Sequence, residues 1–530
     1  MKFDGRNGDL PQTSDYDIVI VGTGPAGMSL AHELNGTGRR VALLEAGGED
    51  FDDATQLLFD GPVTGRDNID LSAARLRMLG GTSNHWGGHC LPLDEIDFAR
   101  RPLGGQTGWP MSRQDMDPFY KRAHVYCDLG NYEYNWRKLG KLTANDFLLA
   151  NTSDLRTETI RQSEPTNFAY KYADIIAASD NIDLWLWTNV VGLDIGDDGT
   201  IGSVRTATIE GLTRQFSAKT VVLACGAVEN ARLLMNHNAL NARALGNAGG
   251  HLGACFMDHP VGGAGFLWPT ETPTEKAYWD HSHEDKDGTP VHFVWRLSDR
   301  ILEEEELGNS QFFLIPLSED TPNPRIGEAN RGMHNLKQIV KWSIGRNVAP
   351  DYKFSEAYCS FIQNADAMAL DHFGQLDREV PTNRILLRYE VEQRPDMENR
   401  VSLTNDRDSL GNLRAALHWS PSLEERDSIV RSTVKIGEIC GAEGFGRVEL
   451  EDHFDERYWD AGTAWHQIGT TRMAVSPNHG VVDENARVHG TKNLYFAGGS
   501  VMPTGGRANP TLTIVALSLR LADHLKSEVL

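Results

Sequence analysis

The fold is decided near the N-terminus, where residues 16–47 read YDIVIVGTGPAGMSLAHELNGTGRRVALLEAG. The pattern predicts an apolar strand, a glycine-rich turn, a helix and a second apolar strand that ends at Glu45. Gly22, Gly24 and Gly27 have G-x-G-x-x-G spacing, which allows a tight turn, close approach of the backbone to a pyrophosphate and close packing of helix on sheet. Glu45 follows Gly27 by 18 residues (45 − 27) and is placed to hydrogen-bond a ribose diol. The stretch therefore predicts a dinucleotide-binding unit of the Rossmann type.

The remaining α/β pattern lies far downstream, in two further segments. Residues 183–190 and 203–209 are strand-like and flank the turn GDDGT, and residues 220–225 form a buried strand that runs into the helical pattern GAVENARLLM. Near the C-terminus, the strand-like NLYFAGG precedes a helical period of apolar residues over 510–525. Because a nicotinamide enzyme usually completes its cofactor fold in consecutive βαβ units, a cofactor domain assembled from three separated segments favours FAD.

The middle of the chain predicts a second kind of sheet. Its strand-like stretches, VHFVWRL, QFFLIPL, RILLRYEVEQ and NRVSLTN, suggest an antiparallel sheet that forms a lid or a substrate wall. We therefore expect an α/β chain (α+β overall) in which a Rossmann-like FAD-binding domain is interleaved with a substrate-binding domain on a mainly antiparallel sheet. The expected boundaries are 1–90, 180–262 and 462–530 for the FAD-binding domain, and 91–179 and 263–461 for the substrate-binding domain.

Composition excludes several classes of function. The 530 residues carry 51 Lys and Arg against 74 Asp and Glu, which gives a formal net charge of −23 at pH 7. A surface this acidic repels nucleic acid and anionic lipid headgroups, so we expect neither as a partner. The sequence has no run of 18 apolar residues, and its six cysteines form no C-x-x-C pair. From the charged residues near its start we expect no export signal. We therefore expect no membrane insertion, no metal site and a cytoplasmic location.

A second glycine-rich loop, LGGTSNHWGGHC over residues 79–90, presents one imidazole at a fixed point. Its glycines let the backbone pass close to a flat ligand. We interpret it as a loop along the edge of a flavin, with His85 near the dimethylbenzene ring. The alternative is a tight loop whose histidine is simply hydrogen-bonded. We expect non-covalent FAD, with a covalent link through His85 as the alternative.

Two C-terminal motifs carry the candidate chemistry. AWHQIGTTRM contains His466, and GGRANPTLTIVALSLRLADHL contains Asn509 before Pro510 and a long amphipathic helix. Asn at the cap and Pro at the first helical position are typical of a helix start. The positive end of that helix would also favour an anionic reduced flavin in front of it.

With these motifs, the chain resembles the glucose-methanol-choline (GMC) oxidoreductases, most closely the branch that contains pyranose 2-oxidases and bacterial glycoside 3-oxidases and 3-dehydrogenases. The resemblance extends over the whole chain. Besides the motifs quoted above, it includes the central VVLACGAVENARLLM, the FMDHP turn of residues 256–260 and NRVSL. It implies that His466 is the catalytic base and that Asn509 is its partner.

The chain departs from the family pattern at two places. Residues 497–500 read AGGS where the family commonly has an Asp, so Gly498 and Gly499 are expected to bind FAD through backbone N–H groups. Gly87 follows Trp86, where pyranose 2-oxidases have Thr after the His-Trp pair of their flavin-linking motif.

The motifs and the resemblance together predict a set of residues that contact FAD. They are Gly22, Gly24, Pro25, Ala26, Gly27, Glu45, Ala46, Gly80, Gly81, Thr82, Asn84, His85, Trp86, Gly87, Gly88, Val190, Ala224, Gly226, Gly498, Gly499, Asn509, Pro510 and Thr511.

The resemblance implies FAD-dependent oxidation of an alcohol. We expect a secondary ring hydroxyl of a pyranose sugar or glycoside to be oxidised to the keto sugar, at C3 in preference to C2. His466 would take the hydroxyl proton, Asn509 would donate to the same oxygen, and the hydride would pass to flavin N5. Oxygen or a quinone-type acceptor would then reoxidise the flavin. The alternatives are oxidation of a primary hydroxyl of an amino sugar, as in antibiotic-pathway relatives, and a redox-silent lyase on the same scaffold. For His89, His259 and His479 we predict structural roles.

Overall fold

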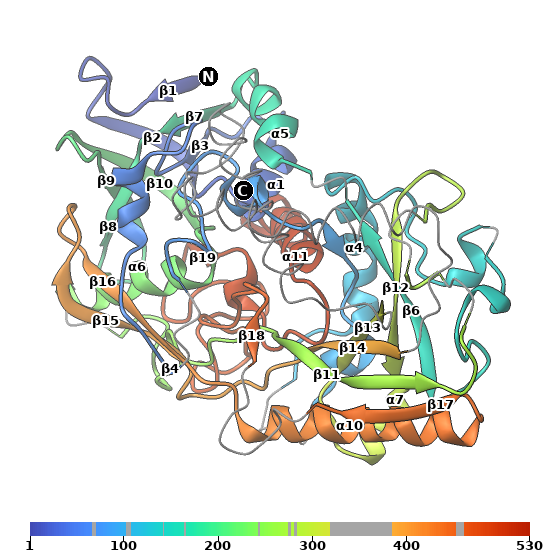
Figure 1. The fold of residues 1–530 in the computed structure, drawn as a ribbon. Coiled ribbons are helices and arrows are strands. Elements are labelled where there is room, and N and C mark those ends of the chain that lie inside the picture. The colour runs from blue at the N-terminus through green and yellow to red at the C-terminus, as the bar shows by residue number, and fades with distance from the viewer. Residues whose placement is uncertain are drawn as a thin grey trace, which may run out of the picture.

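Two large sheets organise the molecule, one at the upper left and one at the lower right of Figure 1. The computed structural model describes residues 1–65, 70–101, 108–140, 142–163, 166–241, 244–273, 277–279, 283–317, 384–451 and 461–529. Segments from both ends of the chain meet in the interior, where the blue α1 (Pro25–Leu34) lies beside the red α11 (Thr511–His524).

The first sheet has eight strands in the order β1-β7-β3-β2-β10-β9-β8, with β19 also paired to β10. The strands from β1 to β10 and the β10–β19 pair are parallel, whereas β10, β9 and β8 pair antiparallel. Since β2, α1 and β3 follow one another in the chain, the strand, turn, helix and second strand predicted for residues 16–47 are confirmed. The bounds are β1 (Lys2–Asp4), β2 (Thr13–Val21), β3 (Val41–Leu44), β7 (Ile182–Leu186), β8 (Asn189–Ile195), β9 (Ile201–Ala207), β10 (Thr213–Leu223) and β19 (Leu494–Phe496).

The strand predicted over residues 183–190 is two strands, because the chain turns between β7 and β8. Trp187 has φ of 56°, in the left-handed region, and its N–H donates to the Gly47 carbonyl at 2.9 Å. Thr188 N–H donates to the Glu45 carbonyl at 2.8 Å. The turn therefore holds residues 188–190 against the end of β3.

Helices cover the first sheet and join it to the rest of the molecule. α1 contacts α11 and α5 (Phe168–Ala177), and α11 also contacts α4 (Arg113–Tyr126). α6 (Gly226–Asn241) follows β10 directly, as the pattern GAVENARLLM predicts. The short helices are α2 (Asp53–Gln56), α3 (Glu95–Phe98), α7 (Asp299–Glu304), the 3-10 turns η1 (Leu57–Phe59), η2 (Gly81–Asn84), η4 (Trp136–Lys138), η5 (Ala144–Asp146) and η7 (Gly499–Val501), and the π-helical turn η8 (Leu525–Val529).

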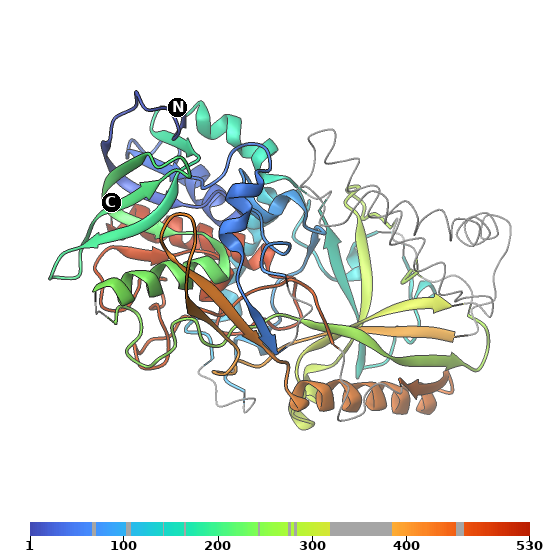
Figure 2. The ribbon, with the colours of Figure 1, turned by 60° about the vertical axis from the view of Figure 1, so that its left-hand side comes forward.

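The second sheet is antiparallel at each of its pairs, in the order β17-β11-β14-β13-β12-β6-β5, with β18 paired to β11. VHFVWRL, QFFLIPL and RILLRYEVEQ contribute β12, β13 and β14, as predicted. The helix α10 (Leu423–Ala442) lies against β17, β11 and β14, below the sheet in Figure 2. The bounds are β5 (His89–Cys90), β6 (Leu155–Gln162), β11 (Pro260–Pro269), β12 (Val291–Leu297), β13 (Ser310–Leu317), β14 (Arg384–Val391), β17 (Gly446–Leu450) and β18 (Gly462–Thr463).

The stretch NRVSLTN belongs to a third sheet instead of the second. It forms β15 (Arg400–Arg407), which pairs with β16 (Leu413–Trp419), and β16 pairs with β4 (Val63–Gly65). Val401 of β15 is fully buried in a small core with Phe256 and Trp419. This local core holds the hairpin between α6 and β4, away from the substrate wall.

The strands of the first sheet come from residues 2–44, 182–223 and 494–496, and we keep the three-segment division of the cofactor domain as a proposal. Residues 318–383 and 452–460 of the predicted substrate-binding domain lie outside the described residues. Among the helices that the structure describes, none is both long enough and apolar enough to span a bilayer.

Candidate active site

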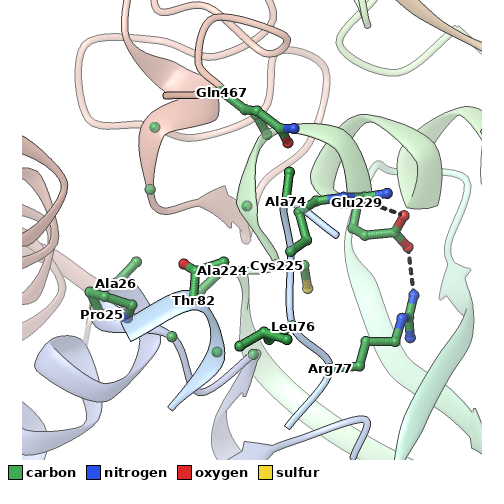
Figure 3. A pocket seen from close by; sticks show the side chains of 18 of the residues that line it. Pro25, Ala26, Ala74, Leu76, Arg77, Thr82, Ala224, Cys225, Glu229 and Gln467 are labelled. Carbon is green, nitrogen blue, oxygen red and sulfur yellow. Dashed lines mark hydrogen bonds and ion pairs between the residues drawn. The ribbon is translucent and has the colours of Figure 1, made fainter. Parts of the chain in front are cut away.

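A cavity of about 450 Å³ opens at the carboxyl ends of the parallel strands of the first sheet. Ligands of open α/β sheets bind at this edge, because the loops that follow the strands gather there. Figure 3 shows side chains from α1, from the end of β10 and from the C-terminal part of the chain around the same pocket, including Pro25, Ala224 and Gln467. The three separated segments therefore share one cavity.

The turn after β2 requires glycine for steric reasons. Gly22 has φ of 102°. A Cβ on Gly27 would lie 1.9 Å from the Gly22 carbonyl oxygen, so the helix packs directly on the turn. A Cβ on Gly24 would meet no protein atom within 4 Å, and Gly24 lines the cavity. The N-terminus of α1, which begins at Pro25, thus meets open space, as a pyrophosphate site needs.

Glu45 is fixed at the end of β3, where its carboxylate lines the cavity. Its Oε1 accepts from Gly47 N–H at 3.0 Å and its Oε2 accepts from Thr23 N–H at 3.2 Å and from the Thr23 hydroxyl. Burial raises the pKa of Glu45, and these hydrogen bonds oppose the shift. One lone pair, on Oε1, remains available to a ribose diol.

Most of the predicted cofactor contacts line this cavity. The exceptions are Gly27, Gly80 and Asn84, which belong to the turn and the loop but do not line the cavity. Gly80 N–H donates to the Thr23 hydroxyl at 3.1 Å, and the Asn84 amide donates to the Gly81 carbonyl at 2.7 Å. The first bond joins the loop of residues 79–90 to the dinucleotide turn, and the second stabilises the loop itself.

His85 lines the cavity beside Trp465, with 6.4 Å between the ring centroids. Burial lowers the pKa of His85 to about 4, so its imidazole is neutral near pH 7. A covalent link between His85 and the flavin stays a prediction.

At the other end of the cavity, the structure reveals a buried charge cluster that the sequence did not predict. Glu229 of α6 accepts from Arg75 at 3.1 Å, from Arg77 at 2.7 Å and from Arg232 at 2.9 Å, and Arg232 also pairs with Asp408. Figure 3 shows the contact between Arg77 and Glu229. Although burial alone would raise the pKa of Glu229, the three arginines lower it to about 2. In the sequence, only the spacing of Glu229 and Arg232 on one helix pointed to this cluster.

His466 and Asn509 meet at the cavity, as the resemblance implies. His466 Nε2 lies 3.1 Å from Asn509 Nδ2, although the two residues are 43 positions apart. Burial holds the pKa of the His466 imidazole well below its ordinary value, and the positive charge of Arg388 adds to the shift. A neutral imidazole is the state that accepts a proton.

Asn509 is not the cap of α11. The helix begins at Thr511 with Pro510 as the capping residue, and no side chain makes a capping hydrogen bond. The Asn509 amide points instead to His466, since it donates to the imidazole. Thr511 and Pro510 line the cavity, so the positive end of α11 faces it as predicted.

His259, for which the sequence predicts a structural role, directly contacts His466. Its Nδ1 lies 2.8 Å from His466 Nδ1, and its Nε2 lies 2.8 Å from the carbonyl oxygen of Gly506. Asp258 accepts from the backbone N–H of His466 at 2.9 Å. The contact arises only in the tertiary structure, because His259 and His466 are 207 positions apart.

The wall of the cavity opposite the turn comes from the second sheet. Arg388 and Glu390, two residues apart on β14, both line it, and Glu390 accepts from the Gln311 amide at 2.8 Å. Trp86 and Trp465 line the same cavity and offer apolar faces. The sequence predicts neither Arg388 nor Glu390 as a site residue. Strand alternation shows which side chains share a face of the sheet, but it does not show that this face borders a cavity.

Comparisons with known proteins match two parts of the chain to protein families. Residues 395–518 match the family described as GMC oxidoreductase, and residues 17–55 match the family described as FAD binding domain. The fructose dehydrogenase large subunit of Gluconobacter japonicus is 22% identical over 98% of this chain and 99% of its own length. The C-glycoside 3-oxidase of Microbacterium trichothecenolyticum is 32% identical, over 25% of each chain.

Among solved structures, a formate oxidase from Aspergillus oryzae has a TM-score of 0.54 at 18% identity, over 98% of this chain and 99% of its own. At this identity the likeness carries the fold alone. The α/β fold class predicted from the sequence is confirmed.

Proposed function

We propose that this chain, a glucose-methanol-choline oxidoreductase that binds FAD, oxidises a secondary ring hydroxyl of a pyranose or glycoside, at C3 in preference to C2. The family, the FAD cofactor and the oxidation of CH–OH groups, all predicted from the sequence, are confirmed. The choice of sugar and of ring position is the proposal. The oxidation of an alcohol at this site rests on one observation above all, the contact of 3.1 Å between His466 Nε2 and Asn509 Nδ2 at the cavity. The preference for C3 of a glycoside rests on the resemblance to glycoside 3-oxidases.

His466 and Asn509 have different roles at the substrate oxygen. The hydroxyl of a secondary alcohol has a pKa far above 7, so loss of hydride requires removal of its proton as charge develops. Neutral His466 takes that proton at Nε2, and Asn509 donates Nδ2–H to the same oxygen. FAD, when bound, supplies the hydride acceptor at N5.

A pyranose also suits the remaining polar groups. Asn509 Oδ1 is buried and has no hydrogen-bond partner among the described residues, so it is free to accept from a hydroxyl next to the reacting one. Glu390 and Arg388 on the opposite wall are suited to further hydroxyls of the ring, and the two tryptophans to its apolar face. The net charge of −23 neither attracts nor repels a neutral sugar. Reoxidation by oxygen or a quinone-type acceptor and a cytoplasmic location belong to the same proposal.

The substrate class is tested by anaerobic mixing of the FAD-loaded protein with a panel of alcohols. The panel contains neutral pyranosides, an amino sugar with a free primary hydroxyl and simple alcohols, and each product is analysed for the position of the new carbonyl. We expect pyranosides to bleach the oxidised flavin band fastest and to give the 3-keto sugar. Bleaching by the amino sugar alone, with an aldehyde as product, would replace the proposal with oxidation of a primary hydroxyl.

A further inference from the structure

A chain of three hydrogen bonds runs through the two active-site histidines. It begins at the carbonyl oxygen of Gly506, which lies 2.8 Å from His259 Nε2. It continues from His259 Nδ1 to His466 Nδ1 at 2.8 Å and ends with the contact of 3.1 Å between His466 Nε2 and Asn509 Nδ2. His259 is 2% exposed, so water does not compete for these bonds.

The chemistry of each group fixes the direction of every bond. A carbonyl oxygen only accepts, so His259 Nε2 must carry a proton. A neutral imidazole has one N–H, which leaves His259 Nδ1 as an acceptor. The proton between the two rings therefore belongs to His466 Nδ1, and His466 Nε2 is left with its lone pair toward Asn509 and the cavity.

We propose that His259 is a positioning residue that holds His466 in the Nδ1–H tautomer, so that Nε2 is always the unprotonated nitrogen. The proposal rests on the proposed function, because only a reaction that needs a base at Nε2 gains from it. A second histidine thus acts through the first without touching the substrate. Free imidazole populates both tautomers, and the Nε2–H form of His466 has no lone pair to offer the alcohol.

Asp258 supports this reading by anchoring both histidines. Its Oδ1 accepts from the backbone N–H of His259 at 2.7 Å and from the backbone N–H of His466 at 2.9 Å. Its Oδ2 accepts from the Thr463 hydroxyl at 2.5 Å. The two imidazole rings cross at 81° with 5.0 Å between their centroids, an edge arrangement that directs one nitrogen at the other. The pair is therefore held by the backbone as well as by the side chains.

Two substitutions at His259 separate positioning from simple packing. His259→Leu removes the acceptor, whereas His259→Asn places Oδ1 near the former Nδ1 and keeps an acceptor for His466 Nδ1–H. We expect His259→Leu to lower the limiting rate of anaerobic flavin reduction by on the order of 10- to 100-fold, with little change in the Kd of the sugar. His259→Asn should recover most of that loss. His479→Leu, at an exposed histidine outside the cavity, is the matched control and should behave as wild type.

The tautomer itself is read by NMR of the FAD-loaded protein with ¹⁵N-labelled histidine. In the wild type, the His466 signals, assigned by their loss in His466→Ala, should show protonated Nδ1 and unprotonated Nε2. In His259→Leu the Nε2–H form should appear, and in His259→Asn it should not.

Protonated Nε2 in the wild type would overturn the proposal, and so would equal loss of rate in the Leu and Asn variants with an unchanged tautomer. If His259→Leu fails to fold, His259→Asn and the wild-type spectrum still decide. If no alcohol reduces the wild-type flavin, the proposed function fails, while the spectrum reports on the tautomer independently.

Discussion

Replacement of His466 by alanine is expected to slow the reduction of bound FAD by its alcohol substrate by about 100-fold or more, the usual loss when a general base is removed. Among the described residues that line the cavity, the His466 imidazole is the base that hydrogen-bonds to Asn509. The remaining rate would come from orientation by the pocket and from Asn509. Stopped-flow absorbance under anaerobic conditions, with a saturating sugar, measures the limiting rate directly.

The control for this experiment is His479→Ala, since His479 is exposed and lies outside the cavity. Both variants should retain FAD, because the dinucleotide turn lies on other segments. An unchanged limiting rate in His466→Ala would reject the catalytic role of His466, whatever the behaviour of the control.

Replacement of Gly27 by alanine is expected to abolish FAD binding. The new Cβ would lie 1.9 Å from the Gly22 carbonyl oxygen. Because that oxygen belongs to the backbone, no side-chain movement can remove the clash. The helix α1 would have to move off the turn, and the N–H groups at its N-terminus would lose their place at the pyrophosphate. The ratio of flavin absorbance to protein absorbance after purification gives the outcome.

Gly441→Ala serves as the matched control. Gly441 lies in the helix α10, where an added Cβ would meet no atom within 4 Å, and alanine favours a helix over glycine by roughly 0.5–1 kcal/mol. This variant should keep full FAD content and gain slightly in stability. Normal FAD content in Gly27→Ala would show that the turn tolerates a side chain and would contradict its assigned packing role.

The parts of the site that the sequence predicted are those with local signals. The glycine spacing of residues 22–27 determines a turn and a helix within one short segment, and the structure has both. The glycines of residues 79–90 likewise predict a loop. His466 and Asn509 were predicted through the resemblance, since neither motif alone indicates that the two side chains meet.

The parts that the sequence did not predict depend on contacts between distant segments. The sequence predicts a structural role for His259, because nothing local in FMDHP indicates that its Nδ1 lies 2.8 Å from the Nδ1 of a histidine 207 positions later. The pairing of Arg75 and Arg77 with Glu229 joins the chain after η1 to α6. Glu390 and Arg388 reach the cavity only because β14 lies between β11 and β13. Each of these contacts is determined by topology, which periodicity and spacing do not report.

The helix boundary at Asn509 illustrates a conflict between local and tertiary preferences. Asn before Pro predicts a capping side chain, because its carbonyl oxygen would accept a hydrogen bond from an exposed N–H of the first turn. In the folded chain the Asn509 amide bonds to His466 instead, and no side chain caps α11. The local rule fails at a residue that the site requires, which is where such failures are expected.

The central claim, that His466 and Asn509 support FAD-dependent oxidation of a sugar hydroxyl, is tested most directly by one stoichiometric measurement. The FAD-loaded protein is mixed without oxygen with each alcohol of the panel, and the bleached flavin and the keto sugar are quantified together. We predict complete loss of the oxidised flavin band with one keto sugar formed for each FAD. An unbleached flavin with every alcohol tried, together with cleavage of a cyanohydrin, would contradict the claim and identify the chain as a redox-silent lyase.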